Sequence, residues 1–191
     1  MIKAMAMLIL GGSLLVGSLR AQSTNVFVVA PATKLEAFDT NVSVVVLRAS
    51  SELGTISASA GALAVSCREV SDMSTGRKEQ GVEIEIGQRT GTPKDTMLID
   101  YDEIAPLLDA IDYLNSLNLS ATSLNALRAT YTTRGGFRIA AQGTRRKGLI
   151  QFNVTDSRTG AAPIVLSRQD VVQFVGFLNQ AKTTLDGLRG Q

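Results

Sequence analysis

The sequence predicts an α+β fold built from two pseudo-repeated units, each an antiparallel sheet of about 3–4 strands followed by one amphipathic helix. Two observations predict it. Residues 76–117 and 143–185 share one order of features: a basic turn, a strand, an Arg-Thr-Gly turn, a short strand and a helix. The apolar positions of the two helices also repeat at a constant offset of 67 residues (171 − 104 = 67). They are Ile104, Leu107, Leu108 and Ile111 in the first helix and Val171, Phe174, Val175 and Leu178 in the second. Such a repeat indicates two equivalent units that share one core.

Residues 1–21 have the features of an export signal. Lys3 gives a short positive region, residues 4–16 are mostly apolar, and small residues lead to Ala21, after which we expect cleavage. The apolar stretch is shorter than the about 20 residues that span a membrane, so we expect no membrane span in the mature chain. An uncleaved anchor or a buried first helix is the alternative. The predicted location is periplasmic or extracellular.

The first unit, residues 22–120, opens with a short β-branched run at 26–29, followed by a stronger one at 42–47. The second run is almost continuously apolar, which predicts a central strand buried on both faces. A further strand is expected at 62–70. Residues 82–86 alternate strictly, with isoleucine and valine on one face and two glutamates on the other, as in a half-buried strand.

A short strand at 97–99 leads into the first helix. Asp100 or Asp102 is expected to cap that helix, and Glu103 stands at the spacing of a capping box. Pro106 favours a start near Asp102, since proline is tolerated only in the first turn. We interpret this acidic cluster as helix capping rather than as a catalytic or metal site, because acidic residues stabilise helix N-termini.

The second unit, residues 121–191, repeats the pattern with strands expected at 129–133, 137–140, 150–154 and 163–166. Ser167 is expected to cap the final helix together with Asp170, and the helix is predicted to run to about Thr184. The two units are predicted to form one compact domain, because a chain of this length supports one core better than two.

The charges are divided unequally between the units. The chain has 19 Lys and Arg and 17 Asp and Glu. Residues 22–120 hold 7 basic and 14 acidic side chains, whereas residues 121–191 hold 10 basic and 3 acidic ones, so the net charges are −7 and +7. This split is consistent with units that attract each other, with head-to-tail self-association, or with a basic surface for an anionic partner.

The residue content argues against an enzyme, a cofactor or a metal site. The chain has no histidine and a single cysteine, Cys67. The sequence therefore gives no support for a zinc site or for a nucleophile paired with an imidazole base. Cys67 lies in an apolar alternating run and is interpreted as a small buried hydrophobic residue. A disulfide between two molecules is the alternative.

A basic patch in the second unit is the strongest candidate for binding. It comprises Arg138, Arg145, Arg146 and Lys147, which a hairpin would bring to one sheet edge, where they could meet phosphates. Phe137, Phe152 and Tyr131 are candidate stacking surfaces for bases, although Phe152 also belongs to the inward-facing set.

Three segments of the second unit carry a resemblance to a known family: residues 137–139, 147–152 and 164–170. Their order resembles the strands-then-helix unit of the PC4/Whirly type of single-stranded DNA-binding proteins. Whirly proteins have two such units in one chain. The resemblance implies that fold and, more distantly, nucleic-acid binding. The chain also resembles small exported bacterial proteins of unassigned function.

Together these features predict an exported, non-enzymatic binding or structural module of unknown ligand. The alternative is binding of a single-stranded nucleic acid or another polyanion through the basic second unit. A protein or an anionic polymer is the expected class of partner.

Overall fold

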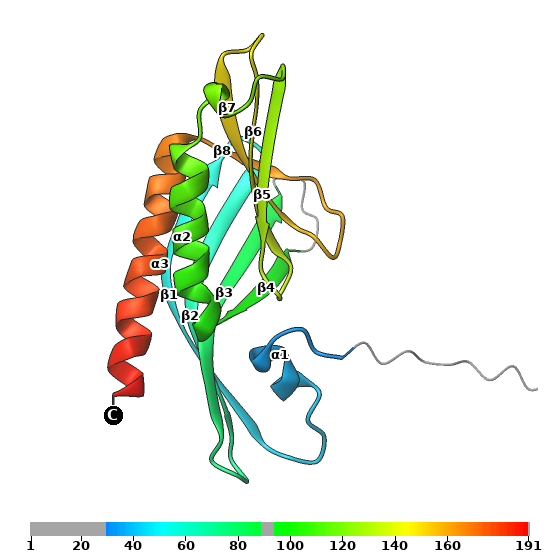
Figure 1. Ribbon diagram of the computed structural model, residues 1–191. Coiled ribbons are helices and arrows are strands. Elements are labelled where there is room, and N and C mark those ends of the chain that lie inside the picture. The colour runs from blue at the N-terminus through cyan, green and yellow to red at the C-terminus, as the bar shows by residue number, and fades with distance from the viewer. Residues whose placement is uncertain (1–29, 89–93, 191) are drawn as a thin grey trace, which may run out of the picture.

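The computed structural model describes residues 30–88 and 94–190. It contains two four-stranded antiparallel sheets, each followed by a helix, which confirms the predicted α+β fold of two strand–helix units (Figure 1). The first sheet has the order β1 (Val46–Ala58), β2 (Gly61–Asp72), β3 (Lys78–Gln88) and β4 (Asp95–Asp100). The second has the order β5 (Ala126–Thr132), β6 (Phe137–Thr144), β7 (Leu149–Asp156) and β8 (Ile164–Leu166). The helices are α1 (Lys34–Asp39), α2 (Tyr101–Ser116) and α3 (Arg168–Arg189), with a 3₁₀ turn η1 (Leu119–Ala121) between the units.

The export signal, the strand expected at 26–29 and the first Arg-Thr-Gly turn at 89–91 lie outside the described residues. None of the helices found in residues 30–88 and 94–190 is long and apolar enough to cross a membrane.

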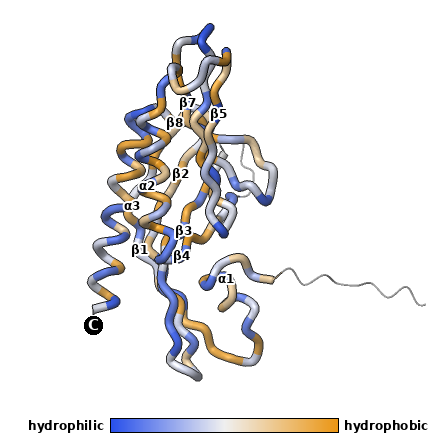
Figure 2. The backbone as a smooth tube through the Cα atoms, viewed as in Figure 1, coloured by the Kyte–Doolittle hydropathy of each residue, from blue (hydrophilic) through white to orange (hydrophobic). Residues whose placement is uncertain are grey.

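Each of the two long helices contacts both sheets. Helix α2 packs on β3 and β4 of its own sheet and on β5 and β6 of the other, while α3 packs on β7 and β8 and on β1, β2 and β3. The two helices also pack against each other and lie side by side in Figure 1. One hydrophobic cluster consequently draws its members from both sheets and both helices, along their apolar sides (Figure 2).

The repeat predicted from the helix positions extends into the strands. Equivalent cross-strand pairs are Val82–Ile99 and Ile84–Met97 in the first sheet and Phe152–Leu166 and Val154–Ile164 in the second. Strands β4 and β8 keep the helix offset of 67 residues (166 − 99 = 67), whereas β3 and β7 differ by 70 (152 − 82 = 70), because the connection to the last strand is three residues longer in the first unit. All eight paired residues are buried, as the alternating pattern predicts.

The prediction of a central strand at 42–47 is wrong. The strand begins at Val46 and lies at the edge of the first sheet, paired with β2. Val42 is 83% exposed, Val45 72% and Leu47 54%. A β-branched apolar run records a preference for extended backbone, but it does not reveal how many neighbours a strand has.

Helix α1 has no counterpart in the second unit, and the sequence did not predict it. Thr33 and Glu36 form a capping box at its start. Its buried residues Leu35 and Phe38 pack with Val70 and Leu98 in a small second cluster on the outer face of the first sheet. The helix approaches β3 closely at Gly81, where a Cβ atom would lie 2.1 Å from the carbonyl oxygen of Ile99 and 2.8 Å from Leu35 Cδ1.

Helix α3 follows its predicted start and exceeds its predicted length. Ser167 and Asp170 form a capping box, as expected. The helix continues to Arg189, because Leu185 remains buried in the shared core beyond the expected end near Thr184.

Two glycine substitutions should separate close packing from helix propensity. Gly81→Ala is expected to lower the free energy of unfolding by about 2 kcal/mol or more. The added methyl group would clash with the backbone carbonyl oxygen of Ile99, which the sheet holds in place. Gly176→Ala, within α3 and with no atom within 4 Å of the new Cβ, is expected to raise it by about 0.5–1 kcal/mol. Urea denaturation measures both, and a neutral Gly81→Ala would contradict the close approach of the β4 backbone and of α1 to Gly81.

Candidate anion-binding face

The outer face of the second sheet is polar and basic. In β5, β6 and β7, alternate residues point into the shared core, including Phe137, Ile139 and Val154, so the residues between them point outward. We call the outward residues of these three strands the basic face. They form three cross-strand rows: Arg128–Gln142–Gln151, Thr130–Ala140–Asn153 and Thr132–Arg138–Thr155.

Two shallow depressions follow the basic face. One, of about 320 Å³, is lined by Arg128, Arg138, Gln142, Asn153 and Thr155, among others, and by Asp156, whose carboxylate pairs with Arg158. The other, of about 330 Å³, is lined by Arg128, Gln142, Gln151 and Lys147. Because both share Arg128 and Gln142, they adjoin each other. Both are open, so they suit an extended ligand better than an enclosed small molecule.

The cations of this face are not neutralised by carboxylates. Arg138 Nε donates a hydrogen bond to Thr132 Oγ1 at 3.1 Å, which keeps its guanidinium on the face. Among the residues that the structure describes, Arg128, Arg138, Arg146 and Lys147 make no ion pair with Asp or Glu. Unpaired cations beside hydroxyl and amide groups supply the donors that an anion requires.

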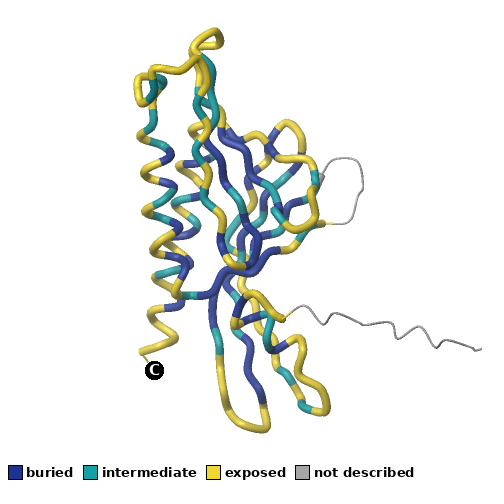
Figure 3. The backbone as a smooth tube through the Cα atoms, turned by 45° about the vertical axis from the view of Figure 1, so that its right-hand side comes forward, coloured by how far each residue is buried: buried dark blue, intermediate teal, exposed yellow. Residues whose placement is uncertain are grey.

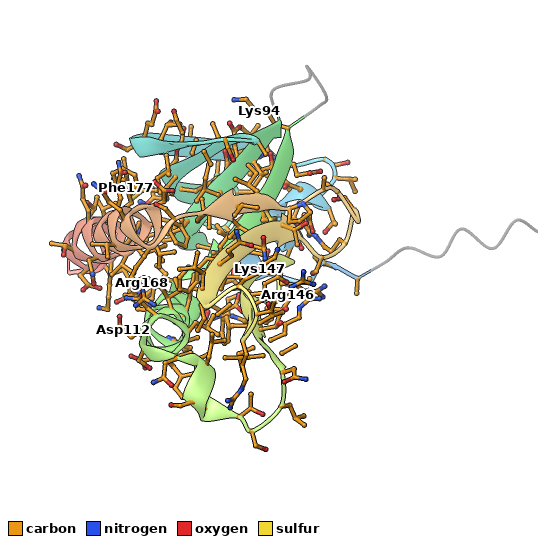
Figure 4. All side chains as sticks on the ribbon, turned by 90° about the horizontal axis from the view of Figure 1, so that it is seen from above. Lys94, Asp112, Arg146, Lys147, Arg168 and Phe177 are labelled. Atoms are coloured by element: carbon orange, nitrogen blue, oxygen red, sulfur yellow. The ribbon has the colours of Figure 1, made fainter. Side chains whose placement is uncertain are left out.

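The four residues predicted to bind an anion divide into two groups. Arg138 and Lys147 line the depressions, and Arg146 lies next to Lys147 at the β6–β7 turn (Figure 4). Arg145 instead donates hydrogen bonds to the carbonyl oxygens of Leu124 at 3.2 Å and Thr122 at 2.7 Å. Its guanidinium therefore braces the turn against the segment between the units.

Arg128 is a residue of this face that the patch prediction missed. It stands alone among apolar neighbours, with Leu127 and Ala129 on either side, whereas the prediction followed runs of consecutive basic residues. The period-2 alternation of β5 was the signal that could have found it, since it places Arg128 opposite the inward residues.

The aromatic residues proposed for stacking do not lie on this face. Phe137 and Phe152 are 0% and 1% exposed, and the Phe137 ring packs against Phe174 with the ring centroids 5.5 Å apart. Tyr131 lies on the core side of β5, partly buried against the shared core. The three rows of the basic face contain no aromatic side chain, so base stacking has no surface there.

The outer face of the first sheet has the opposite charge. Glu83 and Glu85 occupy the positions equivalent to Asn153 and Thr155, at the offset of 70 residues (153 − 83 = 70). Glu83 pairs with Arg68, and Glu85 pairs with Lys94 at 2.7 Å. Its charges are thus largely satisfied within the unit, and α1 covers one end of it.

The acidic cluster at the start of α2 has a different role from the one predicted. Asp100 makes no side-chain capping bond to α2. Its buried carboxylate instead accepts hydrogen bonds from the backbone N–H groups of Lys34, at 2.8 Å, and Leu35, at 3.1 Å. Asp100 therefore occupies the predicted N-cap position of α2, but the expected side-chain capping bond is replaced by bonds to orphan N–H groups of α1.

Glu103 likewise turns away from its own helix. Its carboxylate accepts a hydrogen bond from the backbone N–H of Arg134 at 2.8 Å, and the Arg134 guanidinium lies 2.9 Å from Asp102, 3.3 Å from Glu103 and 3.4 Å from Asp100. Arg134 sits in the β5–β6 hairpin, so the cluster fastens α1 and the second sheet to α2. No group of three His, Cys, Asp or Glu suited to a metal ion is found in the described part of the chain.

Arg158 makes the second charged junction between the units. Its guanidinium contacts the buried Asp156, Glu36 of α1 and the carbonyl oxygen of Thr96 in β4. Arg134 and Arg158 of the basic half are thereby neutralised within the molecule. The basic face keeps the cations that these junctions leave unpaired.

Cys67 has the features of a structural residue. Its side chain is 5% exposed and its thiol lies 3.9 Å from the carbonyl oxygen of Ala181 in α3. Burial raises the pKa of the Cys67 thiol, which disfavours the reactive thiolate.

Comparisons with models of protein families, with curated proteins and with solved structures find no match to this chain.

Two aspartates of the junction provide a matched pair of variants. Asp100→Ala is expected to lower the free energy of unfolding by about 2–3 kcal/mol, because one buried and one part-buried N–H group of α1 lose their acceptor. Asp102→Ala removes a side chain that is 50% exposed, and it should cost less than about 1 kcal/mol. Denaturation with urea measures both; equal losses would contradict the assignment of Asp100 to α1.

Stability should be insensitive to pH near neutrality and fall in acid. Burial opposes the charge on Asp102, but the hydrogen bonds from Arg134 and Lys34 outweigh it and lower the pKa of Asp102. Hydrogen bonds from Ser74 and from Lys182 lower the pKa values of Asp72 and Asp186. Groups with a lowered folded pKa stabilise the fold above the unfolded pKa, about 3.9, and lose that contribution as the pH falls through the folded value. Since the chain has no histidine, thermal midpoints should be level from about pH 5.5 to 8 and drop below about pH 4; a step near pH 6.5 would contradict this.

Proposed function

We propose that this protein is an exported, non-enzymatic binding module that holds an anionic polymer along the basic face. The proposal rests on one observation: some basic side chains of the second unit are paired with carboxylates and others are not. Arg134 and Arg158 are neutralised at the junctions, whereas Arg128, Arg138 and Lys147 line one open surface without a carboxylate partner among the described residues.

The neighbouring side chains favour an extended ligand. The cations alternate with the amides of Gln142, Gln151 and Asn153 and with threonine hydroxyls, along rows that cross three strands. Such a surface offers donors to successive charged groups and to the hydroxyl groups between them. Residues 143–148 continue the positive charge at one end of the strands, where Arg146 and Lys147 lie.

A single-stranded nucleic acid is the second candidate, because the second unit resembles Whirly-type proteins. The absence of aromatic side chains from the basic face means that phosphates rather than stacked bases would supply the affinity. Such binding would show little preference among bases. Export, supported by the features of residues 1–21, favours an extracellular or periplasmic polyanion over a nucleic acid.

Neutralising the basic face should weaken polyanion binding selectively. The triple variant Arg128→Gln, Arg138→Gln, Lys147→Gln removes three unpaired cations, and we expect at least a tenfold loss of affinity for a sulfated oligosaccharide or an oligothymidine. For the oligothymidine, the slope of log K against log salt should fall by about 0.7 per lost phosphate contact. Fluorescence anisotropy between 50 and 200 mM salt measures both.

The matched control removes three exposed cations of the first unit: Arg77→Gln, Lys78→Gln, Lys94→Gln. It changes the net charge equally. The affinity should stay within about twofold, because the variant removes only long-range attraction, which salt largely screens. Equal loss of affinity in the two triple variants would mean that only the net charge matters. Unchanged binding by the basic-face variant would overturn the proposal. Preference for the sulfated oligosaccharide over oligothymidine would favour the first candidate.

A further inference from the structure

Strand β1 leaves one edge of the first sheet open. It pairs with β2 on one side, and no other strand in the described part of the chain pairs with it. Residues 47–52 are all exposed. The lower ends of β1, β2 and β3 continue past the start of α2 (Figure 1), and in Figure 3 the turn between β2 and β3 is exposed while the end of β2 is buried. A flat, open strand edge is a template for pairing with another strand.

The open edge of β1 carries polar and apolar side chains, and exposed apolar residues flank it. Val45, Leu47 and Met73 are 72%, 54% and 60% exposed, and the backbone N–H of Met73 donates to the carbonyl oxygen of Val45. A groove of about 130 Å³ between β1 and the end of α3 is lined mainly by apolar groups, including Ala49 and Leu188. Leu47 is the residue shared by the apolar run 42–47 and the open stretch 47–52.

The charges at this edge are complementary to themselves. Arg48 and Glu52 lie four residues apart on the outer side of β1, with Ser50 midway between them. Glu52 makes no ion pair among the described residues, and its carboxylate only accepts a 3.4 Å hydrogen bond from Thr55. Arg48 pairs with Asp39, but its side chain remains 43% exposed and open to a second carboxylate.

We propose that two copies of this chain associate through β1, with the strands antiparallel about a twofold axis at Ser50. In this register Arg48 faces Glu52 of the partner subunit, and Glu52 faces the partner subunit's Arg48. On the other side of the strand, Leu47 meets Leu53 of the partner subunit, at the margin of the shared core. A closed pair of this kind is isologous, so each attractive contact occurs twice.

The pairing is limited to the open half of β1. The register of β1 shifts between Glu52 and Gly54, and Gly54 packs against Phe177 so closely that a Cβ there would lie 2.4 Å from the ring. About seven residues, 47–53, therefore join the two sheets into one of eight strands. The basic face belongs to the other sheet, so this association does not depend on the proposed function.

A charge exchange tests the partner and the register together. Sedimentation velocity of the purified protein measures the dimer dissociation constant. Arg48→Glu and Glu52→Arg should each weaken the dimer about tenfold or more, because two like-charge pairs replace two attractive ones. The double variant R48E/E52R should restore affinity to within about threefold. Because E52R leaves the Arg48–Asp39 pair intact, its effect on dimerisation does not depend on that contact. Circular dichroism shows whether each variant is folded.

A cross-link tests the position of the axis. In a Cys67→Ala background, S50C should form an intermolecular disulfide under mild oxidation, because directly opposed residues of antiparallel strands have Cα atoms about 4.5–5.5 Å apart. In the control T130C the substituted position is also exposed, on the edge strand β5 of the second sheet, and it should not cross-link. A chain that stays monomeric at about 100 μM, a dimer without the S50C cross-link, or a dimer that the double variant fails to restore would each overturn the proposal.

Discussion

The need to cover two half-apolar sheets with two helices determines the rest of this structure. Neither helix serves one sheet alone: α2 reaches β5 and β6, and α3 reaches β1, β2 and β3. A four-stranded sheet with one helix would leave part of its apolar face in water, so the units stabilise each other by sharing helices. This exchange turns the inner faces of both sheets into core. Only the outer faces, the edges and the hairpin ends remain available for recognition, which is why the candidate site lies on a sheet exterior.

The two units share a backbone arrangement, but the side chains on their outer sheet faces differ. Equivalent core positions stay apolar in both units, but the outer positions of β3 hold glutamates and those of β7 hold amide and hydroxyl side chains. Packing constrains the inner residues, whereas water tolerates either charge outside. The difference in charge between the units has two consequences. At the junctions, Arg134 and Arg158 bind carboxylates contributed by the first unit, and on the second sheet the remaining cations stay unpaired. The opposite net charges thus act partly within the molecule, as an attraction between its halves.

Much of the fold could be predicted from local patterns, while the failures involve partners distant in sequence. The helix offset and the alternation at 82–86 are local periodicities, and they placed their residues in the core, apart from Leu108 and Val175, which are partly buried against it. Asp100 stands at the predicted N-cap position, but its hydrogen bonds were missed because their donors lie 65 and 66 residues earlier, in a short helix with weak sequence signals. The run at 42–47 was placed in the sheet centre because its composition reports strand preference and not neighbours. Of the candidate site, the basic turn was visible in the sequence. Alternation in β5 could have placed Arg128 outward, but its position beside Arg138 and Lys147 required knowing which strands adjoin. The hydrogen bonds of Arg145 required knowing where the link between the units passes.

Association through β1 would change what the basic face can bind without altering its residues. The open edge belongs to the first sheet and the basic face to the second, so a dimer would carry two such faces. For a short anion the two faces are independent sites, and the affinity per site equals that of a monomer. A polymer long enough to reach both would bind the second face at the effective concentration set by its own length and stiffness, which strengthens overall binding without any new contact. Selection for long polyanions would then come from the geometry of the assembly, while the charge of each face would supply only the attraction common to all of them.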